Sequence, residues 1–517
     1  MSKQTFLRGT FILVGAGFVT KVLGFINKIV VARIIGEEGV GLYMMAVPTF
    51  ILAVTLTRLG LPVAISKMVA EADAVNDTKK IKKVLVVSLT LTGVLSVIWT
   101  AGLFIVAPIL AKTFFTDERT LYPLLAIAPV VPIVAISSVI RGYFQGKQNM
   151  RPSAYSQVIE QVVRIALVAF FTMAFLPYGV EFAAAGAMIS VVFGELASLI
   201  YLFSKFKLNK KFKVRASFFQ QIKQGKETFH SLMSISLPTT GSQLIGSVSY
   251  FFEPIIVAQS LALAGVLPTV ATQQYGALTG FAIPLLLLPG FITYAISTSL
   301  IPAISESAAQ KHYRSIDYRI NQAIRFSFIA GGISFIITYI FAFPLMDLLY
   351  DAPQFAVYVQ LMAPFFFFHY FQGPLAASLQ ALGFAKAAMI NSLVGALVKT
   401  FGIFALASNP NLGIKGVALA ISIGIVLVTL MHLATIMKVT SFKLQIMDLT
   451  KCLITVSVCF LLAKPIFQIL VTKNDLFQST LLAILFVTLL FFLTSIIVGA
   501  IKKEDLKAIP FIRRWVK

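Results

Sequence analysis

The chain has 517 residues, of which 58% are hydrophobic and only 12% are charged, and its mean hydropathy is +0.90. A soluble protein of this length would carry roughly 25% charged residues, so these values exclude an ordinary soluble globular protein. The formal net charge of +23 first suggests nucleic-acid binding, but cytoplasmic loops of membrane proteins collect Lys and Arg in the same way. We therefore expect an all-α, polytopic membrane protein that binds no nucleic acid.

About 14 apolar segments follow one another along the chain, and each is long enough to cross a membrane. A span needs about 20 apolar residues to cross roughly 30 Å of hydrocarbon at about 1.5 Å per residue. The N-terminal stretch runs directly into a full-length span, without the short apolar core and cleavage site of a signal peptide. The predicted spans are 10–33, 40–65, 84–110, 121–143, 154–176, 181–203, 235–262, 275–301, 320–349, 356–382, 387–407, 414–437, 448–471 and 478–500.

The loops predict the orientation of the chain. With a cytoplasmic N-terminus, the cytoplasmic side collects about 29 Lys and Arg residues and the outer side about four. This asymmetry predicts that both termini are cytoplasmic and that the number of spans is even. The longest loop, 204–228, is strongly basic; its charge fits the same topology signal, with binding to anionic lipid headgroups as the alternative.

An internal repeat predicts two similar halves. The segment "APVVPIVAISSVIRGYFQG" begins at Ala128, and "APFFFFHYFQGPLAASLQA" begins at Ala363. At this offset Arg164 corresponds to Lys399, whereas Glu160 corresponds to Gly395. Because each copy has six spans, both insert in the same orientation, which predicts a parallel pseudo-twofold repeat with a substrate site between the halves.

The repeat also predicts the domain boundaries. Residues 1–204 form an N-lobe with spans 1–6, and residues 229–440 form a C-lobe with spans 7–12. A basic cytoplasmic linker, 205–228, joins them. Residues 441–517 hold spans 13 and 14 and a basic cytoplasmic tail, and they have no counterpart in the repeat.

Basic residues lie inside the first two predicted spans. A lysine at the bilayer centre costs about 2.5–3.5 kcal/mol on insertion scales, so it should face a polar cavity. Lys21 and Lys28 are seven residues apart and share one helix face, and Arg58 in span 2 can approach the depth of Lys21. We expect these three residues to line a cationic cavity for a pyrophosphate. Snorkelling and internal ion pairing are the alternatives.

Other polar residues inside spans have two interpretations each. Glu253 corresponds to Asn27 in the repeat, and it is either a counter-charge that couples transport to an ion or a fixed partner of the lysines. Glu160 and Arg164, an i, i+4 pair, either form a polar wall of the N-lobe cavity together with Asn27 or neutralise each other. Glu195 has no evident partner in the sequence.

The remaining motifs point to no chemistry on a substrate. Cys452 and Cys459 form neither a metal-ligand pattern nor a disulfide framework, and His369 and His432 suit structural roles. No phosphate-binding Walker A motif is present, so we expect no cofactor, no metal and no ATP hydrolysis. Several spans contain proline, which permits bends, and "GYFQG" fits a small-xxx-small packing pattern.

Four phrases in order give a family resemblance: "TKVLGFINKIVVARIIGEEGVGLYMMAVPTF", "RLGLPVAISKMVAEA", "IRGYFQGKQNM" and "SQVIEQVVRI". Together they resemble the polysaccharide-export branch of the multidrug/oligosaccharidyl-lipid/polysaccharide (MOP) exporter superfamily. Within it, the chain is similar to the stage V sporulation protein B group of spore-forming Gram-positive bacteria, which is related to the lipid II flippases. The resemblance covers essentially the whole chain.

The resemblance implies a flippase for undecaprenyl-diphosphate-linked sugars of peptidoglycan synthesis, serving the spore cortex from the bacterial plasma membrane. Lys21 matches a basic residue of those flippases; their second basic position is Asn27 here, with Lys28 next to it. Their basic residue in span 8 has no counterpart, because 275–301 contains no Lys or Arg. Implied partners are lipid-linked oligosaccharide, membrane lipids, coupling Na+ or H+, and cell-wall synthesis enzymes. Spans 13 and 14 would help to form a groove for the polyprenyl tail.

Three alternatives stay open at this point. A cation-coupled multidrug exporter of the same superfamily would need an acidic or aromatic cavity rather than a basic one. A membrane sugar polymerase or ligase would need sizeable outer loops, and the outer loops here are short. The third alternative is a non-transporting scaffold for cell-wall enzymes.

Overall fold

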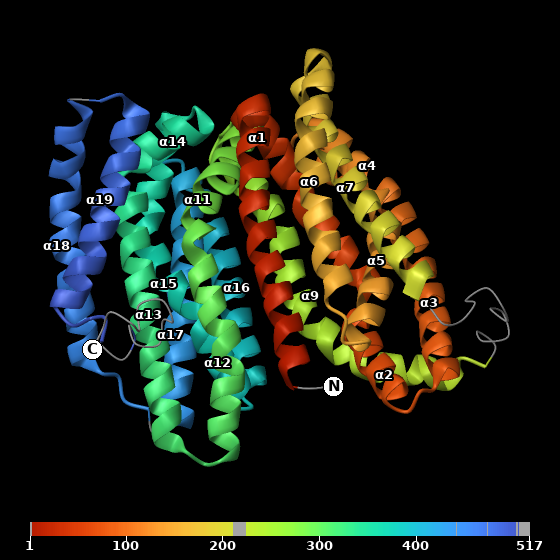
Figure 1. Cartoon of the computed structure of the whole chain (residues 1–517). Coiled ribbons are helices and arrows are strands. Elements are labelled where there is room, and N and C mark those ends of the chain that lie inside the picture. Colours follow the sequence, from red (N-terminus) through yellow and green to blue (C-terminus); the bar gives the residue numbers. More distant parts are fainter. Residues whose placement is uncertain (1–2, 210–223, 441, 473, 503–504, 506–517) are drawn as a thin grey trace. The chain divides into compact units, whose positions relative to one another are not determined.

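The computed structural model describes residues 3–209, 224–440, 442–472, 474–502 and 505, and every regular element in those residues is a helix. Figure 1 follows these helices from α1 near the N-terminus to α19 near the C-terminus. The all-α prediction is confirmed. The centre of the predicted linker 205–228 and most of the predicted tail from residue 502 lie outside the described residues.

The helices form two compact units, the first of which comprises Met1–Gly280 and Ala407–Ile414. Its long helices cover the predicted spans 1–7, and short 3-10 or π turns lie between some of them. These elements are α1 (Lys3–Arg58), α2 (Leu61–Ala74), α3 (Thr78–Ile109), η1 (Leu110–Phe114), η2 (Glu118–Thr120), α4 (Leu121–Ile127), α5 (Val130–Gly146), α6 (Arg151–Phe175), η3 (Leu176–Tyr178), α7 (Val180–Asn209), α9 (Lys226–Leu263), α10 (Pro268–Gly276) and most of η4 (Ala277–Ala282).

The second unit comprises Phe281–Leu406 and Lys415–Lys517. Its elements are α11 (Ile283–Leu287), η5 (Leu288–Gly290), α12 (Phe291–Ala309), α13 (Tyr313–Ile340), α14 (Ala342–Tyr350), η6 (Pro353–Phe355), α15 (Ala356–Ala381), α16 (Ala385–Ala407), α17 (Ile414–Val439), α18 (Ile446–Val471) and α19 (Leu476–Ile497). The two units are defined by which helices pack together, whereas the two lobes were predicted from the sequence repeat. The lobe boundaries therefore stay a prediction.

The described residues contain 11 helices that are long and apolar enough to cross a membrane, or up to 12 when a bent pair counts as one span. One of them, Gly15–Ala74, has 60 residues and exceeds a single crossing of about 30 Å at about 1.5 Å per residue. A polytopic helical membrane protein is therefore confirmed, whereas the count of 14 spans stays a prediction.

Helix α1 is interrupted at Gly36, between the predicted spans 10–33 and 40–65. Gly36 has φ 62° and ψ −172°, which is not helical. Only glycine adopts such a positive φ without strain, since it has no Cβ. The two spans predicted from hydropathy therefore meet at this glycine rather than at a polar loop.

The predicted span 275–301 is not one straight helix. It consists of α10, η4, α11, η5 and α12, and the two halves of the pair Pro268–Leu287 and Gly290–Ala309 are bent by 55°. Pro284 and Pro289 lie at the interruptions. Proline lacks an amide hydrogen and clashes with the preceding turn, which explains why the helix breaks here.

Glycines bring several helices of the first unit close together. A Cβ at Gly142 would lie 3.0 Å from the carbonyl oxygen of Pro62, and one at Gly146 would lie 2.7 Å from that of Ser66. The small-xxx-small pattern thus packs α5 directly on α2. A Cβ at Gly276 would overlap the backbone of Gly41, so α10 lies backbone to backbone against α1.

A buried ion cluster joins three segments of the second unit. Arg325 on α13 is 3% exposed; its Nη2 donates to Oδ2 of Asp505 at 2.5 Å, and its Nη1 donates to Oδ2 of Asp448 at 3.3 Å. Lys502 Nζ also lies 2.7 Å from Oδ2 of Asp448. Because Asp448 begins α18 and Asp505 follows α19, this cluster holds both C-terminal helices against α13.

An ion-pair network of the first unit connects Asp117, which lies between two candidate spans, to α1 and α10. Arg119 donates from Nη2 to Asp117 at 2.9 Å and from Nη1 to Glu38 at 2.6 Å. Thr272 donates from its hydroxyl to Asp117 at 2.9 Å. Burial by itself raises the pKa of Asp117, but the hydrogen bonds from Arg119 and Thr272 and the charge of Arg119 lower that pKa below its usual value.

We expect an Asp117→Asn variant to lose about 1–2 kcal/mol of unfolding free energy at pH 7, because the hydrogen bonds from Arg119 and Thr272 to the carboxylate weaken. The lowered folded-state pKa of Asp117 stabilises the protein fully above the unfolded pKa of about 3.9, and this contribution is lost as the pH falls from there through the folded-state pKa. The difference in melting temperature between the detergent-purified variant and the wild type should therefore shrink from pH 7 to pH 3. The exposed Glu306→Gln is the control. Equal melting of Asp117→Asn and wild type at pH 7 would contradict the prediction.

Candidate substrate-binding site

The first half of α1 carries three of the predicted site residues. Lys21 is exposed, Lys28 is half-buried and Asn27 is buried with 6% exposure. Between them, a Cβ at Gly24 would meet only Oε1 of Gln161 on α6, at 3.9 Å. The helix face that contains Gly24 therefore has room beside α6 rather than a tightly packed neighbour.

Two adjacent polar groups on α1 have no partner among the residues that the structure describes. The Oδ1 atom of Asn27 is buried and accepts no hydrogen bond there. Lys28 forms no salt bridge within those described ranges. A half-buried cation next to a buried carbonyl oxygen favours binding of a polar ligand, because unpaired polar groups are costly to bury.

Arg58, the last residue of α1, lies in a different environment. Its Nε is buried without a hydrogen-bond partner among the described residues. It interacts electrostatically with Glu195, Arg141 and Glu160, three charged residues with which Lys28 forms no salt bridge among the described residues. Whether Arg58 and the two lysines line a common cavity therefore stays a prediction.

Three helices of the first unit bring four charged side chains together. Glu160 on α6 binds Arg164 one turn later, with Nη2 donating to Oε1 at 2.7 Å, so the predicted i, i+4 contact is present. Arg141 on α5 lies 3.4 Å from Glu160 and 3.6 Å from Glu195 on α7, and it donates to the Ser198 hydroxyl at 2.8 Å. We refer to Arg58, Arg141, Glu160, Arg164 and Glu195 as the arginine cluster.

The arginine cluster carries three guanidinium groups and two carboxylates, so its net charge is positive when all five groups are ionised. Four of its buried atoms lack a hydrogen-bond partner among the described residues: Nε of Arg58, Arg141 and Arg164, and Oε2 of Glu195. Guanidinium donors match the geometry of phosphate oxygens. The cluster therefore combines excess positive charge with unused donors.

A glycine explains why the cluster is compact. A Cβ at Gly194 on α7 would lie 2.9 Å from the carbonyl oxygen of Glu160 and 3.2 Å from Cβ of Arg164. The absence of a side chain lets α7 approach α6 directly at the ion pair. The next residue, Glu195, is thereby brought to Arg141.

Sequence reasoning missed Arg141 as a member of the site and left Glu195 without a partner. Arg141 lies within a span and 19 residues before Glu160, so no helical periodicity relates the two residues. A buried arginine inside an apolar span is the signal that could have singled it out, because such charges need partners.

Glu253 on α9 is buried with 7% exposure. It interacts electrostatically with Tyr250, one turn before it, and with Tyr275 on α10. A carboxylate at this position, surrounded by phenol groups, can hold a proton or contribute an oxygen ligand to a small cation. Neither the ion-coupling role nor the fixed-partner role of Glu253 is decided by this geometry.

The histidines and cysteines have structural contacts. Nδ1 of His432 lies 3.1 Å from the Asn391 amide nitrogen, and both residues are buried. Cys452 and Cys459 are buried free thiols. Within the described ranges, no group of three or more His, Cys, Asp or Glu side chains could hold a metal ion.

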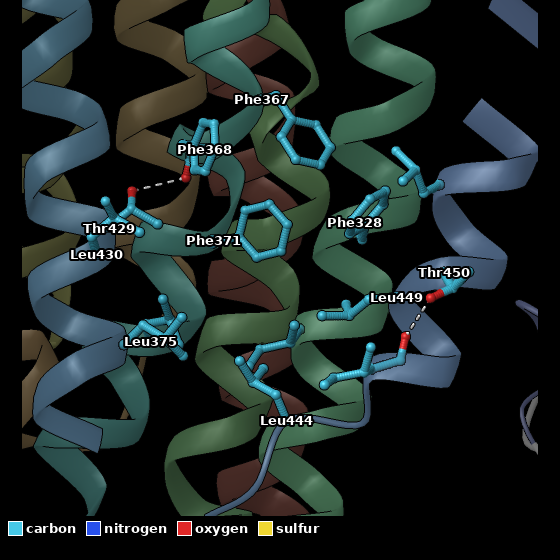
Figure 2. A pocket seen from close by; sticks show the side chains of 14 residues that line it. Phe328, Phe367, Phe368, Phe371, Leu375, Thr429, Leu430, Leu444, Leu449 and Thr450 are labelled. Carbon is cyan, nitrogen blue, oxygen red and sulfur yellow. Dashed lines mark hydrogen bonds between the residues drawn. The ribbon is translucent and has the colours of Figure 1, made fainter. Parts of the chain in front are cut away.

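The second unit contains an apolar groove of about 420 Å³ (Figure 2). Its walls come from α13, α15, α17 and α18, and the only polar side chains that line it are two threonines. The Thr429 hydroxyl donates to the Phe368 carbonyl at 3.0 Å, which fixes one wall. Predicted span 13, α18, therefore lines this groove, whereas α19 contributes no lining residue. The groove residues are Ile324, Phe328, Phe367, Phe368, Phe371, Leu375, Thr429, Leu430, Leu433, Leu444, Ile446, Leu449, Thr450 and Leu453.

Comparison with known families matches residues 6–308 to the family described as "Polysaccharide biosynthesis protein", and residues 254–404 to the MatE family. A similar relative is Stage V sporulation protein B of Bacillus subtilis (strain 168), which is 57% identical over 516 residues and matches over the full length of both chains. The chain belongs to the polysaccharide biosynthesis protein family. The family resemblance predicted from the sequence is thereby confirmed.

Two further relatives of this polysaccharide biosynthesis family member also come from Bacillus subtilis (strain 168). Sporulation protein YkvU is 31% identical over 84% of this chain and 95% of its own. Lipid II flippase MurJ is 25% identical over 62% of this chain and 61% of its own.

Solved structures show the fold of this family member. The structure titled "Lipid II flippase MurJ, inward closed conformation" has a TM-score of 0.71 at 16% identity and covers 96% of this chain and 99% of that chain. An inward-facing multidrug resistance MATE family transporter of the MOP superfamily has a TM-score of 0.66 at 18% identity, covering 81% and 94%. The protein is therefore a multi-pass membrane protein with the fold of the MOP superfamily transporters.

Proposed function

We propose that this protein is a flippase that moves an undecaprenyl-diphosphate-linked sugar, a lipid II-like peptidoglycan precursor, across the cytoplasmic membrane by alternating access. The observation that carries the proposal is the arginine cluster, in which three half-buried arginines have buried Nε atoms without a hydrogen-bond partner among the described residues. Lys28 and Asn27 on α1 add a second set of polar groups inside a span.

The chemistry of the substrate supports this assignment. A diphosphate offers several anionic oxygens, and each can accept a charge-assisted hydrogen bond from Arg or Lys. Buried cations inside a membrane protein are tolerated where they meet an anion or water, and they mark transport pathways. Lys21, Lys28 and Arg58 would receive the diphosphate, while Asn27, Glu160 and Arg164 would line the wall of the same cavity.

The apolar groove suits the other end of the substrate. Its two threonine hydroxyls, Thr429 and Thr450, both donate to backbone carbonyls at 3.0 Å, so the groove presents almost no free polar atoms. A polyprenyl chain would be buried there at about 25 cal/mol per Å² of apolar surface.

A role in spore cortex synthesis is part of the proposal, and it rests on the full-length similarity to Stage V sporulation protein B. Contact with cell-wall synthesis enzymes would follow from that role. A cationic site can also use the membrane potential, which is worth about 2.3 kcal/mol per elementary charge per 100 mV. No step in this cycle requires ATP.

We further propose that Glu253 couples flipping to Na+ or H+. A Glu253→Gln variant should flip substrate at the wild-type basal rate but lose any acceleration by an imposed Na+ or H+ gradient. Parallel assays with each gradient across the same vesicles measure this. Equal acceleration in both proteins would show that Glu253 is a fixed structural partner.

The proposed function is tested by reconstituting the full chain in vesicles that contain labelled undecaprenyl-diphosphate-linked sugar. The labelled headgroup should reach the opposite leaflet much faster than in protein-free vesicles, and a monophosphate-linked analogue should move more slowly. Transport of cationic drugs instead would favour the multidrug exporter, which the MatE match at 254–404 makes the second candidate. Absence of any transport would favour a scaffold.

A further inference from the structure

A further cavity lies within the second unit, apart from the groove, and three polar side chains contribute to its otherwise apolar lining. It has a volume of about 290 Å³ and is lined by residues of α15, α16 and α17 together with Leu287. Its polar lining residues are His369, Gln372 and Lys399. No carboxylate is among the described residues that line it, so Lys399 is the source of charge in its wall.

Lys399 lies deep within its span. It is 14 residues from the start of α16, a helix of 23 residues, which places it about 21 Å along the helix axis. His369 is equally central in α15, 13 residues from the start of a helix of 26. A lysine near the middle of a membrane is costly unless its ammonium meets polar groups, and this cavity provides them.

Local packing supports the repeat relation between Lys399 and Arg164. In the first unit, a Cβ at Gly194 would lie 3.2 Å from Cβ of Arg164. In the second, a Cβ at Gly424 would lie 3.1 Å from Cβ of Lys399 and 3.4 Å from the carbonyl oxygen of Gly395. In both units a glycine packs against the same i, i+4 pair of positions, so the helix at Lys399 has the same close glycine contact as the helix at Arg164.

The acids of the first unit have no equivalents in the second. Glu160 corresponds to Gly395, whose Cβ would overlap the side chain of Val428, so α16 and α17 leave no room for a carboxylate there. The residue that follows Gly424 is Ile425, whereas Glu195 follows Gly194. The second unit therefore retains the cation of this arrangement without the two carboxylates, and an open cavity adjoins it.

We propose that this cavity is an anion-binding subsite in which the Lys399 ammonium binds one carboxylate or phosphate group. The inference deepens the proposed function, since the headgroup of a lipid-linked peptidoglycan precursor supplies such groups beyond its diphosphate. Gln372 donates from Nε2 to the Ile425 carbonyl at 2.8 Å and hydrogen-bonds with His369, so the polar wall is held in place. A volume of about 290 Å³ is at the small end of ligand pockets and suits one acidic group rather than a disaccharide.

The test measures binding by calorimetry with the purified full chain. Three probes are titrated: an undecaprenyl-diphosphate-linked sugar with a carboxylate-bearing peptide, undecaprenyl diphosphate alone, and inorganic phosphate. Lys399→Gln should weaken binding of at least one of two probes, the peptide-bearing lipid and inorganic phosphate. The expected loss of affinity is about tenfold, which corresponds to about 1.4 kcal/mol. Lys399→Arg should retain most of the affinity, and the exposed Lys464→Gln on α18 is the matched control.

The outcomes separate the two proposals. Wild-type affinity of Lys399→Gln for all three probes would overturn the subsite while leaving the flippase assignment intact. A wild type that binds neither lipid but binds phosphate through Lys399 would support the subsite and contradict the flippase. If Lys399→Gln does not fold, the rate of acylation of Lys399 in the wild type is measured by mass spectrometry instead. Slower acylation in the presence of a probe supports the subsite. An unchanged acylation rate with all three probes overturns the subsite.

Discussion

A Lys28→Gln variant is expected to flip the lipid-linked headgroup about 10- to 100-fold more slowly than the wild type. A hydrogen bond to a charged group contributes about 1.5–3 kcal/mol, and each 1.4 kcal/mol is a factor of ten. Lys28 is half-buried on α1 and has no salt bridge within the described ranges, so removing its charge breaks no internal ion pair. The rate is measured with labelled lipid-linked substrate in vesicles of defined composition.

Two variants serve as controls for this experiment. Lys28→Arg keeps the positive charge and should retain most of the activity, and Lys464→Gln removes an exposed lysine of α18 and should flip normally. Purified Lys28→Gln should melt at or above the wild-type temperature, because a half-buried charge without a salt bridge among the described residues is removed. If Lys28→Gln flips the substrate at the wild-type rate, the assignment of α1 to the headgroup site is wrong.

The second large effect is expected on stability. Replacing Arg141 with methionine leaves Glu160 and Glu195 on neighbouring helices with fewer compensating charges, because Arg141 lies 3.4 Å and 3.6 Å from them. Removing one partner from a buried ion pair destabilises proteins by about 3–5 kcal/mol. Thermal and denaturant unfolding of the detergent-purified chain measure the loss.

A double-mutant cycle identifies the cause of that loss. Adding Glu195→Gln to Arg141→Met should restore part of the stability, because the uncompensated carboxylate disappears. Arg151→Met removes an exposed arginine at the start of α6 and should leave stability nearly unchanged. If Arg141→Met unfolds like the wild type, the arginine cluster contributes no net stability.

Helix positions were the part of the fold most accessible to sequence reasoning. The predicted spans 356–382 and 387–407 agree closely in their bounds with α15 (Ala356–Ala381) and α16 (Ala385–Ala407), and of these two α16 is also among the helices apolar enough to cross a membrane. The predicted span 320–349 instead divides into α13 and α14 at Phe341. Such a break depends on how neighbouring helices pack, which hydropathy along one chain does not report.

The candidate site was predicted well only where its contacts are local. Glu160 and Arg164 lie on one helix face, and their contact follows from helix geometry. The contacts of Arg141 with Glu160 and Glu195 join three helices, and no spacing rule indicates them. For the groove, the sequence reasoning suggested both C-terminal helices as walls. Of these two helices, α18 contributes lining residues and α19 does not. Which face a helix presents depends on its neighbours, and the sequence does not report this.

The ion cluster at Arg325 has a consequence for how the chain is made. Asp448 and Asp505 follow this arginine by 123 and 180 residues. At about 5–20 residues per second, the ribosome needs roughly 9–36 s to reach Asp505 after it has synthesised Arg325. During this interval the guanidinium of Arg325 lacks its contact with Asp505. The ion cluster can therefore be completed only after Asp505 has been synthesised.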